Sequence, residues 1–234
     1  VKPPTMVFPY FENFDSPAWL PGLGTPTSPG VFGSGDWVRN PEPVGTTGAN
    51  TSIYVGKDLT PVEGTGPRWS RKNRGNYLYL GGPLGPATTA YLESTKCIDL
   101  STATSPVLSF WYHSVGTGCG PIAVEYLPVG SNQWIPLSGS SLSMPFQTIE
   151  TQDWQFHQVS LSLLVGQQVR LRISLSTNGT GVMYHTAIDE LLIYNRPAAD
   201  VGVTAITSPA NTVSLTAPVG INVVVRNFGT AAQT

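Results

Sequence analysis

The chain has 234 residues, a formal net charge of −2 at pH 7, and only 11% charged residues. This balance argues against a nucleic-acid-binding surface, and no stretch approaches the ~18 consecutive apolar residues of a membrane span. Gly (25) and Pro (21) are abundant, which together with many Ser and Thr is typical of a loop-rich all-β protein.

Short β-prone segments separated by turn residues follow one another along the chain and predict strands rather than helices. Residues 16–50 are rich in Gly, Pro and Ser, and we expect a long loop there, anchored by Trp19 and Trp37. Neither a heptad nor a sustained helical period occurs. The strands are expected at residues 6–15, 75–82, 89–100, 106–116, 121–130, 134–139, 154–164, 167–176 and 185–195.

Two of these segments alternate clearly, so their two faces can be distinguished, and the second also predicts which face is buried. In 106–116, Leu108, Phe110 and Tyr112 share one face. In 167–176, four apolar residues face inward and alternate with polar residues that include Arg170. Many short alternating strands predict a β-sandwich of the jelly-roll type.

The composition changes at "NRPAAD" (195–200), a short linker that contains proline. Beyond it, residues 201–210 and 220–229 predict two further strands. Two strands cannot enclose a sandwich core, so we expect them to be the first strands of a second, immunoglobulin-like sandwich. The predicted division is a jelly-roll domain over residues 1–196 and part of an immunoglobulin-like domain over residues 197–234.

The segment "TAIDELLIYN" (186–195) predicts a buried strand, yet it carries Asp189 and Glu190 side by side. Strict alternation would put Asp189 on one face with Leu191, and Glu190 on the other with Ile188, and both faces are apolar. An unpaired buried carboxylate is strongly unfavourable, so it requires backbone donors, an arginine or a metal ion.

Two arrangements meet this requirement. In the first, Asp189 accepts backbone N–H groups and Glu190 is solvated at a strand end. In the second, hard oxygen ligands from distant segments gather with Asp189 around Ca²⁺. The donors that the chain offers for this second arrangement are Glu12, Asn13, Asp15, Asp36 and Asn76.

The sequence shows no catalytic constellation. Its three histidines, His113, His157 and His185, form no HExxH or other close pair, and no GxSxG occurs. Glycoside hydrolysis needs a pair of acids that face one cleft, whereas alternation would turn the adjacent Asp189 and Glu190 in opposite directions. We therefore expect a protein that is not an enzyme.

The aromatic residues allow two interpretations: a platform on which sugar rings stack, or packing in the core and at sheet edges. Trp69, in "PRWSRKNR" (67–74), is the best candidate for exposure. It lies in a loop with Arg68 and Arg71, which would suit an acidic glycan or protein partner. The other platform candidates are Tyr77, Tyr79, Trp111, Trp134 and Trp154.

The chain has two cysteines, Cys97 and Cys119. In an extracellular protein these two would pair in a disulfide, whereas in a reducing compartment they would be free, buried thiols. The low charge, the many Thr and Ser residues and the scarcity of Lys favour the extracellular setting, and with it the disulfide.

Several segments, in their order, resemble a MAM domain, an adhesive jelly-roll module of cell-surface receptors and metalloproteases. The resemblance covers residues 6–196 and rests mainly on "FPYFENFDS" (8–16), "AYLES…CIDLS" (90–101), "PVLSFWYHSVG" (106–116) and "AIDELLIYN" (187–195). Similar modules occur in secreted and surface proteins of gliding bacteria that use type IX secretion. The resemblance implies an all-β, concanavalin-like or jelly-roll sandwich.

The last segments also resemble a known type of domain. "DVGVTAITSPA…VVVRNFGT" (200–230) is similar to the immunoglobulin-like (CARDB-like) repeats that follow such modules in bacterial surface proteins. This resemblance implies that other domains of the same polypeptide are among the partners of the chain.

Modules of this kind often hold a structural Ca²⁺ between the first strand and the aspartate of the last. Carried onto this chain, the resemblance implies Glu12, Asn76 and Asp189 as calcium ligands, with Asp36 added from the long loop. Animal MAM domains usually carry four cysteines and this chain has two, so the animal disulfide pattern cannot be transferred as a whole.

Together these features predict a non-catalytic adhesion or recognition module of a larger secreted or surface-anchored protein. Its expected ligand is a protein or glycan on a cell surface, and we expect it to be extracellular. The alternative is an accessory carbohydrate-binding module of a secreted hydrolase.

Overall fold

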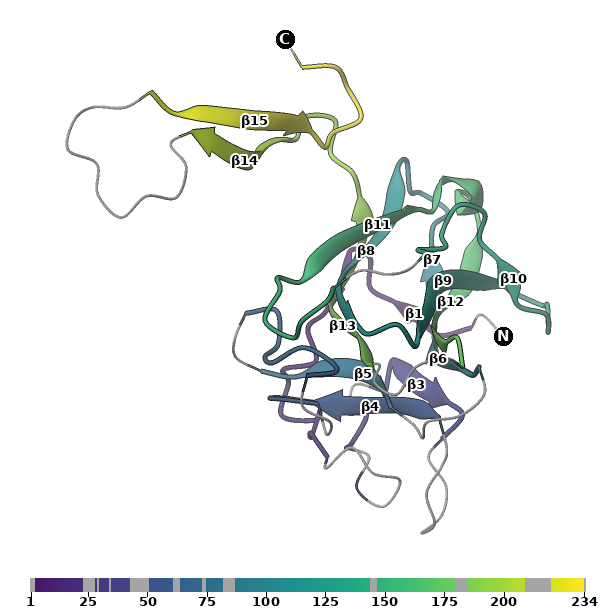
Figure 1. Cartoon of the computed structure of the whole chain (residues 1–234). Coiled ribbons are helices and arrows are strands. Elements are labelled where there is room, and N and C mark those ends of the chain that lie inside the picture. Colours follow the sequence, from purple (N-terminus) through teal and green to yellow (C-terminus); the bar gives the residue numbers. More distant parts are fainter. Residues whose placement is uncertain are drawn as a thin grey trace. The chain divides into compact units, whose positions relative to one another are not determined.

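The structure is a computed structural model that describes residues 3–22, 28, 30–33, 35–42, 51–60, 64–72, 75–81, 87–143, 147–179, 185–208 and 220–233. The chain divides into two compact units, Val1–Tyr194 and Asn195–Thr234 (Figure 1). Among the described residues, no helix is long and apolar enough to cross a membrane.

The fold is all-β, as predicted, and its only regular helical element within the described ranges is one short 3₁₀ turn. The elements are β1 (Thr5–Met6), β2 (Tyr10–Glu12), β3 (Trp37–Asn40), β4 (Ser52–Gly56), β5 (Tyr77–Gly81), β6 (Thr89–Ser94), β7 (Cys97–Asp99), β8 (Pro106–Val115), β9 (Cys119–Pro128), β10 (Ile135–Pro136), β11 (Gln155–Ser160), η1 (Ser162–Leu164), β12 (Gln168–Thr177), β13 (His185–Asn195), β14 (Val201–Ser208) and β15 (Asn222–Asn227).

The strands of the first unit form two sheets. Sheet A contains β1, β3, β6, β7, β9, β10 and β12, and sheet B contains β2, β4, β5, β8, β11 and β13. From β8 onward the chain passes repeatedly from one sheet to the other, with β8, β11 and β13 in sheet B and β9, β10 and β12 in sheet A (Figure 1). These crossings give the jelly-roll sandwich that the sequence predicts.

The core lies between the two sheets and takes alternate residues from the long strands β8 and β12. Leu108 and Phe110 of β8 and Leu171 of β12 are fully buried in it. Burial of a large apolar side chain stabilises the fold by roughly 1.5–3 kcal/mol. Trp19 and Trp37 join the same core, each 1% exposed, as expected for the anchors of the segment 16–50.

The segment expected to be one long loop contains a strand. β3 pairs with β6, so that Trp37 lies opposite Ser94 and Asn40 lies opposite Tyr91. The strand has only four residues, and its pairing with β6 holds them extended. β4, which the sequence analysis also missed, pairs with β5. Residues 43–50 of the expected loop lie outside the described residues.

β13 departs from strict alternation at Asp189 and Glu190. Ile188, Leu191 and Ile193 all lie in the core, so Ile188 and Leu191 face the same way although three positions separate them. Glu190 has a φ of 50°, a left-handed conformation that adds one residue to the strand as a β-bulge does. The prediction that Asp189 shares a face with Leu191 is therefore wrong, because Leu191 points into the core and Asp189 points away from it.

The two cysteines are free, buried thiols. Cys97 precedes Ile98, which pairs with Val169 of β12, whereas Cys119 pairs with Thr177 near the other end of that strand. Eight positions along a strand span on the order of 25 Å, and a disulfide requires Cα atoms within about 7 Å. The predicted disulfide is therefore wrong, because the register of β12 holds the two thiols apart.

The second unit is a two-stranded antiparallel sheet in which Val203 of β14 lies opposite Val225 of β15. The Arg196 guanidinium donates hydrogen bonds to the carbonyl oxygen of Phe228 at 2.9 and 2.7 Å. Residues 211–219, which connect the two strands, lie outside the described residues. The identity of this unit as the start of an immunoglobulin-like sandwich stays a prediction.

Candidate functional site

A cleft of about 540 Å³ opens on the outer side of sheet B. Trp111 of β8 reaches it because its neighbours in the strand, Phe110 and Tyr112, point into the core. A cleft that combines aromatic rings with a few charged groups is typical of a ligand site. Its lining consists of Arg68, Trp69, Arg71, Trp111, Glu150, Thr151, Gln152, Asp153 and Trp154.

The first wall of the cleft is the loop 64–72, which is fastened to the bulge of β13. Asp189 Oδ2 accepts a hydrogen bond from the backbone N–H of Arg71 at 2.9 Å, and its Oδ1 accepts one from the N–H of Glu190 at 2.7 Å. Glu190 forms an ion pair with Lys72 at 2.5 Å. The bulge thus lets both carboxylates of β13 contact the same loop.

Further contacts fix the beginning of this loop. The carbonyl oxygen of Thr65 accepts the backbone N–H of His185 at 2.7 Å, and its hydroxyl lies 2.6 Å from His185 Nδ1. The N–H of Gly64 donates to Glu150 Oε2 at 2.8 Å. The loop is therefore held from two sides, by β13 and by the segment 147–154.

The second wall is the segment 147–154, which is anchored on β8. Gln147 Oε1 accepts the backbone N–H of Ser114 at 2.8 Å, and His113 Nε2 lies 3.1 Å from the carbonyl oxygen of Gln152. Burial lowers the pKa of His113 to about 4. The imidazole is therefore neutral at pH 7 and donates its Nε2–H to that carbonyl.

Trp69 is the most exposed tryptophan of the cleft, with 45% of its surface exposed, and the Arg68 guanidinium lies 5.2 Å from its ring centroid. The indole N–H of Trp154 donates to the carbonyl oxygen of Trp69 at 3.0 Å, so the two tryptophans are linked. Trp111 carries the guanidinium of Arg71 over its ring, 3.8 Å from the ring centroid. Of the three indoles, Trp69 therefore offers the most accessible stacking surface.

The charges in the cleft are unequally neutralised. Arg68 lies 3.7 Å from Glu150, which also accepts the N–H of Gly64. Arg71 forms no ion pair within the described ranges, and its buried Nε has no hydrogen-bond partner. Asp153 is exposed to solvent. The cleft thus combines an accessible indole with a guanidinium that no described carboxylate neutralises.

The structure separates the predicted platform residues into three groups. Trp111 and Trp154 join Trp69 at the cleft. Tyr77 and Tyr79 are only 0% and 2% exposed and lie in a buried cluster against which Trp154 packs. They therefore pack behind Trp154 and offer almost no surface to a ligand. Of the two interpretations of the aromatic residues, packing in the core applies to these two tyrosines.

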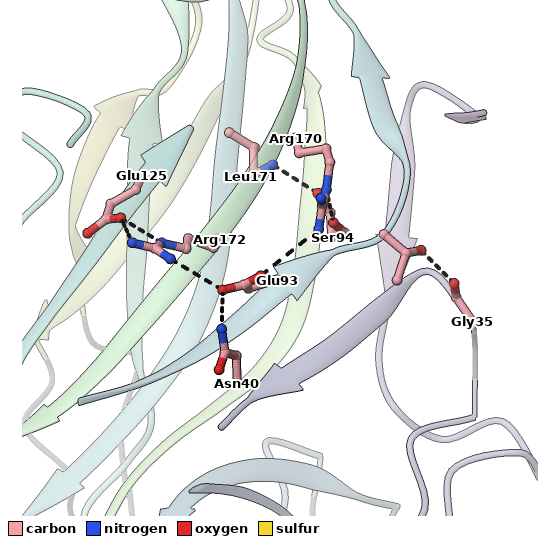
Figure 2. Close-up of polar contacts among 9 residues, drawn as sticks. Gly35, Asn40, Glu93, Ser94, Glu125, Arg170, Leu171 and Arg172 are labelled. Atoms are coloured by element: carbon pink, nitrogen blue, oxygen red, sulfur yellow. Dashed lines mark hydrogen bonds and ion pairs between the residues drawn. The ribbon is translucent and has the colours of Figure 1, made fainter. Parts of the chain in front are cut away.

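Trp134 lies on the other sheet, where Arg172 of β12 is 4.6 Å from its ring centroid. Arg172 contacts both Glu93, at 3.3 Å, and Glu125, and Asn40 donates to Glu93 at 3.1 Å (Figure 2). Positive and negative charges neutralise one another in this network, so we interpret it as a support for the outer side of sheet A.

The structure does not gather the four expected calcium ligands at one point. Glu12 is paired with Leu191 in register and therefore lies on the inward side of sheet B, whereas Asp189 points outward. Asp36 forms an ion pair with Lys96 at 2.6 Å. In the part of the chain that the structure describes, no group of three or more His, Cys, Asp or Glu side chains could hold a metal ion.

Asn76 and Asp189 are instead brought near Asp15. The side-chain amide of Asn76 donates to two backbone carbonyls at 2.8 and 3.0 Å, and its backbone N–H donates to Asp15 Oδ1 at 2.7 Å. Burial, together with the charges of Glu190 and Asp15, raises the pKa of Asp189 to about 7. The carboxylates available to a cation here are therefore Asp15 and Asp189.

Sequence reasoning missed Glu150 and Asp153 as lining residues. The wall that carries them is far from Trp69 in the chain, as Trp154 and Trp69 are 85 residues apart. The available signal is local: the polar stretch that ends at Asp153 joins two strands, and such loops often carry binding residues.

No family model matches this chain, and no curated protein matches it in sequence. Solved structures with similarity include the K1 cleaved adhesin domain of Lys-gingipain from Porphyromonas gingivalis W83, at 17% identity, 81% coverage of this chain, 99% of that chain and a TM-score of 0.41. TmCBM61, solved in complex with β-1,4-galactotriose, gives 16% identity, 79% and 99% coverage, and a TM-score of 0.39.

The glycoside hydrolase domain of Endo-D from Streptococcus pneumoniae R6 gives 14% identity, covers 82% of this chain and has a TM-score of 0.43. The present chain spans only 26% of that chain's length. TM-scores at this level say nothing about the function of this chain.

Proposed function

We propose that the first unit is a non-catalytic recognition module that binds a glycan in the cleft between the loop 64–72 and the segment 147–154. The observation that carries this proposal is the accessible ring of Trp69, next to Trp111 and Trp154 in an open cleft. A sugar ring can place its apolar face on an indole while nearby polar groups bind its hydroxyls.

The state of the cleft carboxylates supports a binding role over hydrolysis. Glu150 already accepts the N–H of Gly64 and pairs with Arg68. Glycoside hydrolysis requires one carboxyl to donate a proton and a second to act as base or nucleophile. Asp153 alone cannot fill both roles.

We place this module in a longer extracellular or surface-anchored protein, as a MAM-like adhesion domain followed by an immunoglobulin-like domain that begins with β14 and β15. The order of the sequence segments supports this placement. An accessory module of a secreted hydrolase would use the same cleft. The complete gene separates the two: a catalytic domain favours the hydrolase, and repeats with a C-terminal secretion domain favour adhesion.

A glycan array followed by affinity electrophoresis tests the binding role. Trp69→Ala should weaken the binding of any retained glycan roughly tenfold, because it removes the stacking surface. Trp134→Ala, on the opposite sheet, is the matched control and should bind as the wild type does. The proposal fails if the wild type retains no glycan, or if Trp69→Ala binds as tightly as the wild type.

We further propose a structural Ca²⁺ bound by Asp15 and Asp189 in place of the full expected set. A buried carboxylate whose pKa is raised beside a second carboxylate is a position where a cation would relieve repulsion. A chelator should lower the melting temperature of the wild type and leave that of Asp189→Asn unchanged. Equal melting temperatures of the wild type with and without chelator would contradict this proposal.

A further inference from the structure

The guanidinium of Arg71 is held at the cleft without a partner of opposite charge among the described residues. It lies 3.8 Å from the centroid of the Trp111 ring, and its Nε has no hydrogen-bond partner. Asp189 accepts the backbone N–H of Arg71, and no ion pair joins the guanidinium to a carboxylate among the described residues. Stacking on an indole stabilises the cation through the ring face and leaves its in-plane N–H donors free for an acceptor.

The neighbouring cations differ from Arg71 because each is neutralised. Arg68 lies 3.7 Å from Glu150, and Lys72 lies 2.5 Å from Glu190. In the described lining of the cleft, Arg71 is therefore the cation that remains for a ligand. A planar guanidinium offers two parallel N–H donors, a geometry that matches two oxygens of one anionic group.

We infer that the glycan bound in this cleft is acidic, with a carboxylate or sulfate group that pairs with Arg71 while a sugar ring stacks on Trp69. Trp69 and Arg71 are separated by one residue in the same loop, which is fixed at its end by Asp189. Asp153, which is exposed in the same lining, opposes an anion and limits the affinity. This inference rests on the proposed function, because it specifies the ligand of the same cleft.

The test measures the binding of three polysaccharides by calorimetry: polygalacturonate, a sulfated galactan and a neutral galactan. The wild type should bind one of the acidic polymers at least about tenfold more tightly than the neutral one, as expected for a charged hydrogen-bonded pair. Arg71→Gln should remove this preference, so that neither acidic polymer binds more tightly than the neutral one. Asp153→Asn should strengthen the acidic binding, and Arg71→Lys should retain part of it.

Lys57→Gln is the matched control, because it removes one exposed positive charge away from the cleft. It should leave all three affinities unchanged, whereas added salt should weaken acidic binding to the wild type more than to Arg71→Gln. The acidic polymer that loses more affinity in Arg71→Gln identifies the group as carboxylate or sulfate.

The results separate the two proposals. If the wild type binds the neutral galactan as tightly as both acidic polymers, and Trp69→Ala weakens that binding, the inference is overturned and the proposed function is retained. An equal loss in Lys57→Gln and Arg71→Gln shows general charge attraction and also overturns the inference. Failure to bind any of the three polymers, or any array glycan, overturns both.

Discussion

Asp189 links the strand β13 to the loop of the candidate cleft, and its ionisation has a measurable cost. Its two backbone hydrogen bonds, from Arg71 and Glu190, favour the charged carboxylate. Burial and the nearby negative charges favour the protonated acid and prevail, so that the pKa rises from 3.8 to about 7.

This shift predicts how stability depends on pH. Between about pH 4 and pH 7 the folded chain retains a proton that the unfolded chain has released, so Asp189 lowers the free energy of unfolding as the pH rises, by up to roughly 1.4 kcal/mol per pH unit. Urea unfolding in chelator buffer at pH 5 and pH 7.5 measures this contribution as the difference between the wild type and Asp189→Asn.

The comparison with Asp189→Asn is needed because buried histidines act in the opposite direction. Burial lowers the pKa of His113 and of His185 to about 4, so their contribution to stability increases with pH between about 4 and 6.5. The free energy of unfolding of the wild type should fall relative to that of Asp189→Asn as the pH rises from 5 to 7.5. A difference that is constant between the two pH values would show that Asp189 is ionised in the folded chain throughout.

At the scale of single elements, the bulge in β13 determines which side chains reach the loop 64–72. Glu190 occupies a left-handed conformation that costs a residue with a β-carbon about 1–3 kcal/mol. In return, Ile188 and Leu191 both reach the core, and Asp189 and Glu190 both contact the loop. The left-handed conformation of Glu190 thus lets the apolar side chains of β13 stay in the core while both adjacent carboxylates lie outside it.

Two substitutions at position 190 test this conformation. Glu190→Gly loses the pair with the exposed Lys72, worth at most about 1 kcal/mol, but it relieves the backbone strain, so its free energy of unfolding should be close to that of the wild type. Glu190→Val loses the same pair and adds a β-branched side chain at positive φ, so it should be about 1–2 kcal/mol less stable than Glu190→Gly. If Glu190→Val is at least as stable as Glu190→Gly in urea, the bulge is not present as described.

The register of β12 also predicts the state of the cysteines. Protein unfolded without reductant should yield two titratable thiols with a thiol reagent, because Cys97 and Cys119 are held at distant points of the sheet. The native protein should react slowly, since burial raises the pKa of both thiols. Detection of no thiols after unfolding would mean that a disulfide exists and that this register is incorrect.

At the scale of the whole molecule, the core of the first unit draws on residues from Met6 to Ile193. The second unit exposes apolar side chains on its two strands, among them Val203 at 59% and Ile206 at 65%. Such strands favour pairing with further chain, which agrees with their proposed place at the start of a larger sandwich.

Removal of residues 195–234 tests the independence of the first unit. The shortened chain should melt within about 3 °C of the full chain, a shift that corresponds to ~1 kcal/mol or less for a domain of this size. It should also bind the same glycans. A much lower melting temperature, or loss of the cooperative transition, would show that the second unit contributes to the fold of the first.

The sequence by itself determined the all-β class, the inward face of β12, and Trp19 and Trp37 as anchors, because a two-residue period and the pattern of turn residues are local properties of the chain. It also singled out the loop around Trp69, whose role as a ligand site stays a prediction. Only the tertiary structure decided where Asp189 and Glu190 point, because one left-handed residue reverses the alternation that a sequence pattern assumes.

The tertiary structure likewise decided which distant residues meet. The separation of Cys97 and Cys119 follows from the register of β12, and the joining of Trp154 to Trp69 follows from the packing of two loops on sheet B. Both depend on pairing between segments far apart in the chain. Such pairing is set by the shape and burial of the whole core, which the local succession of residue types does not specify.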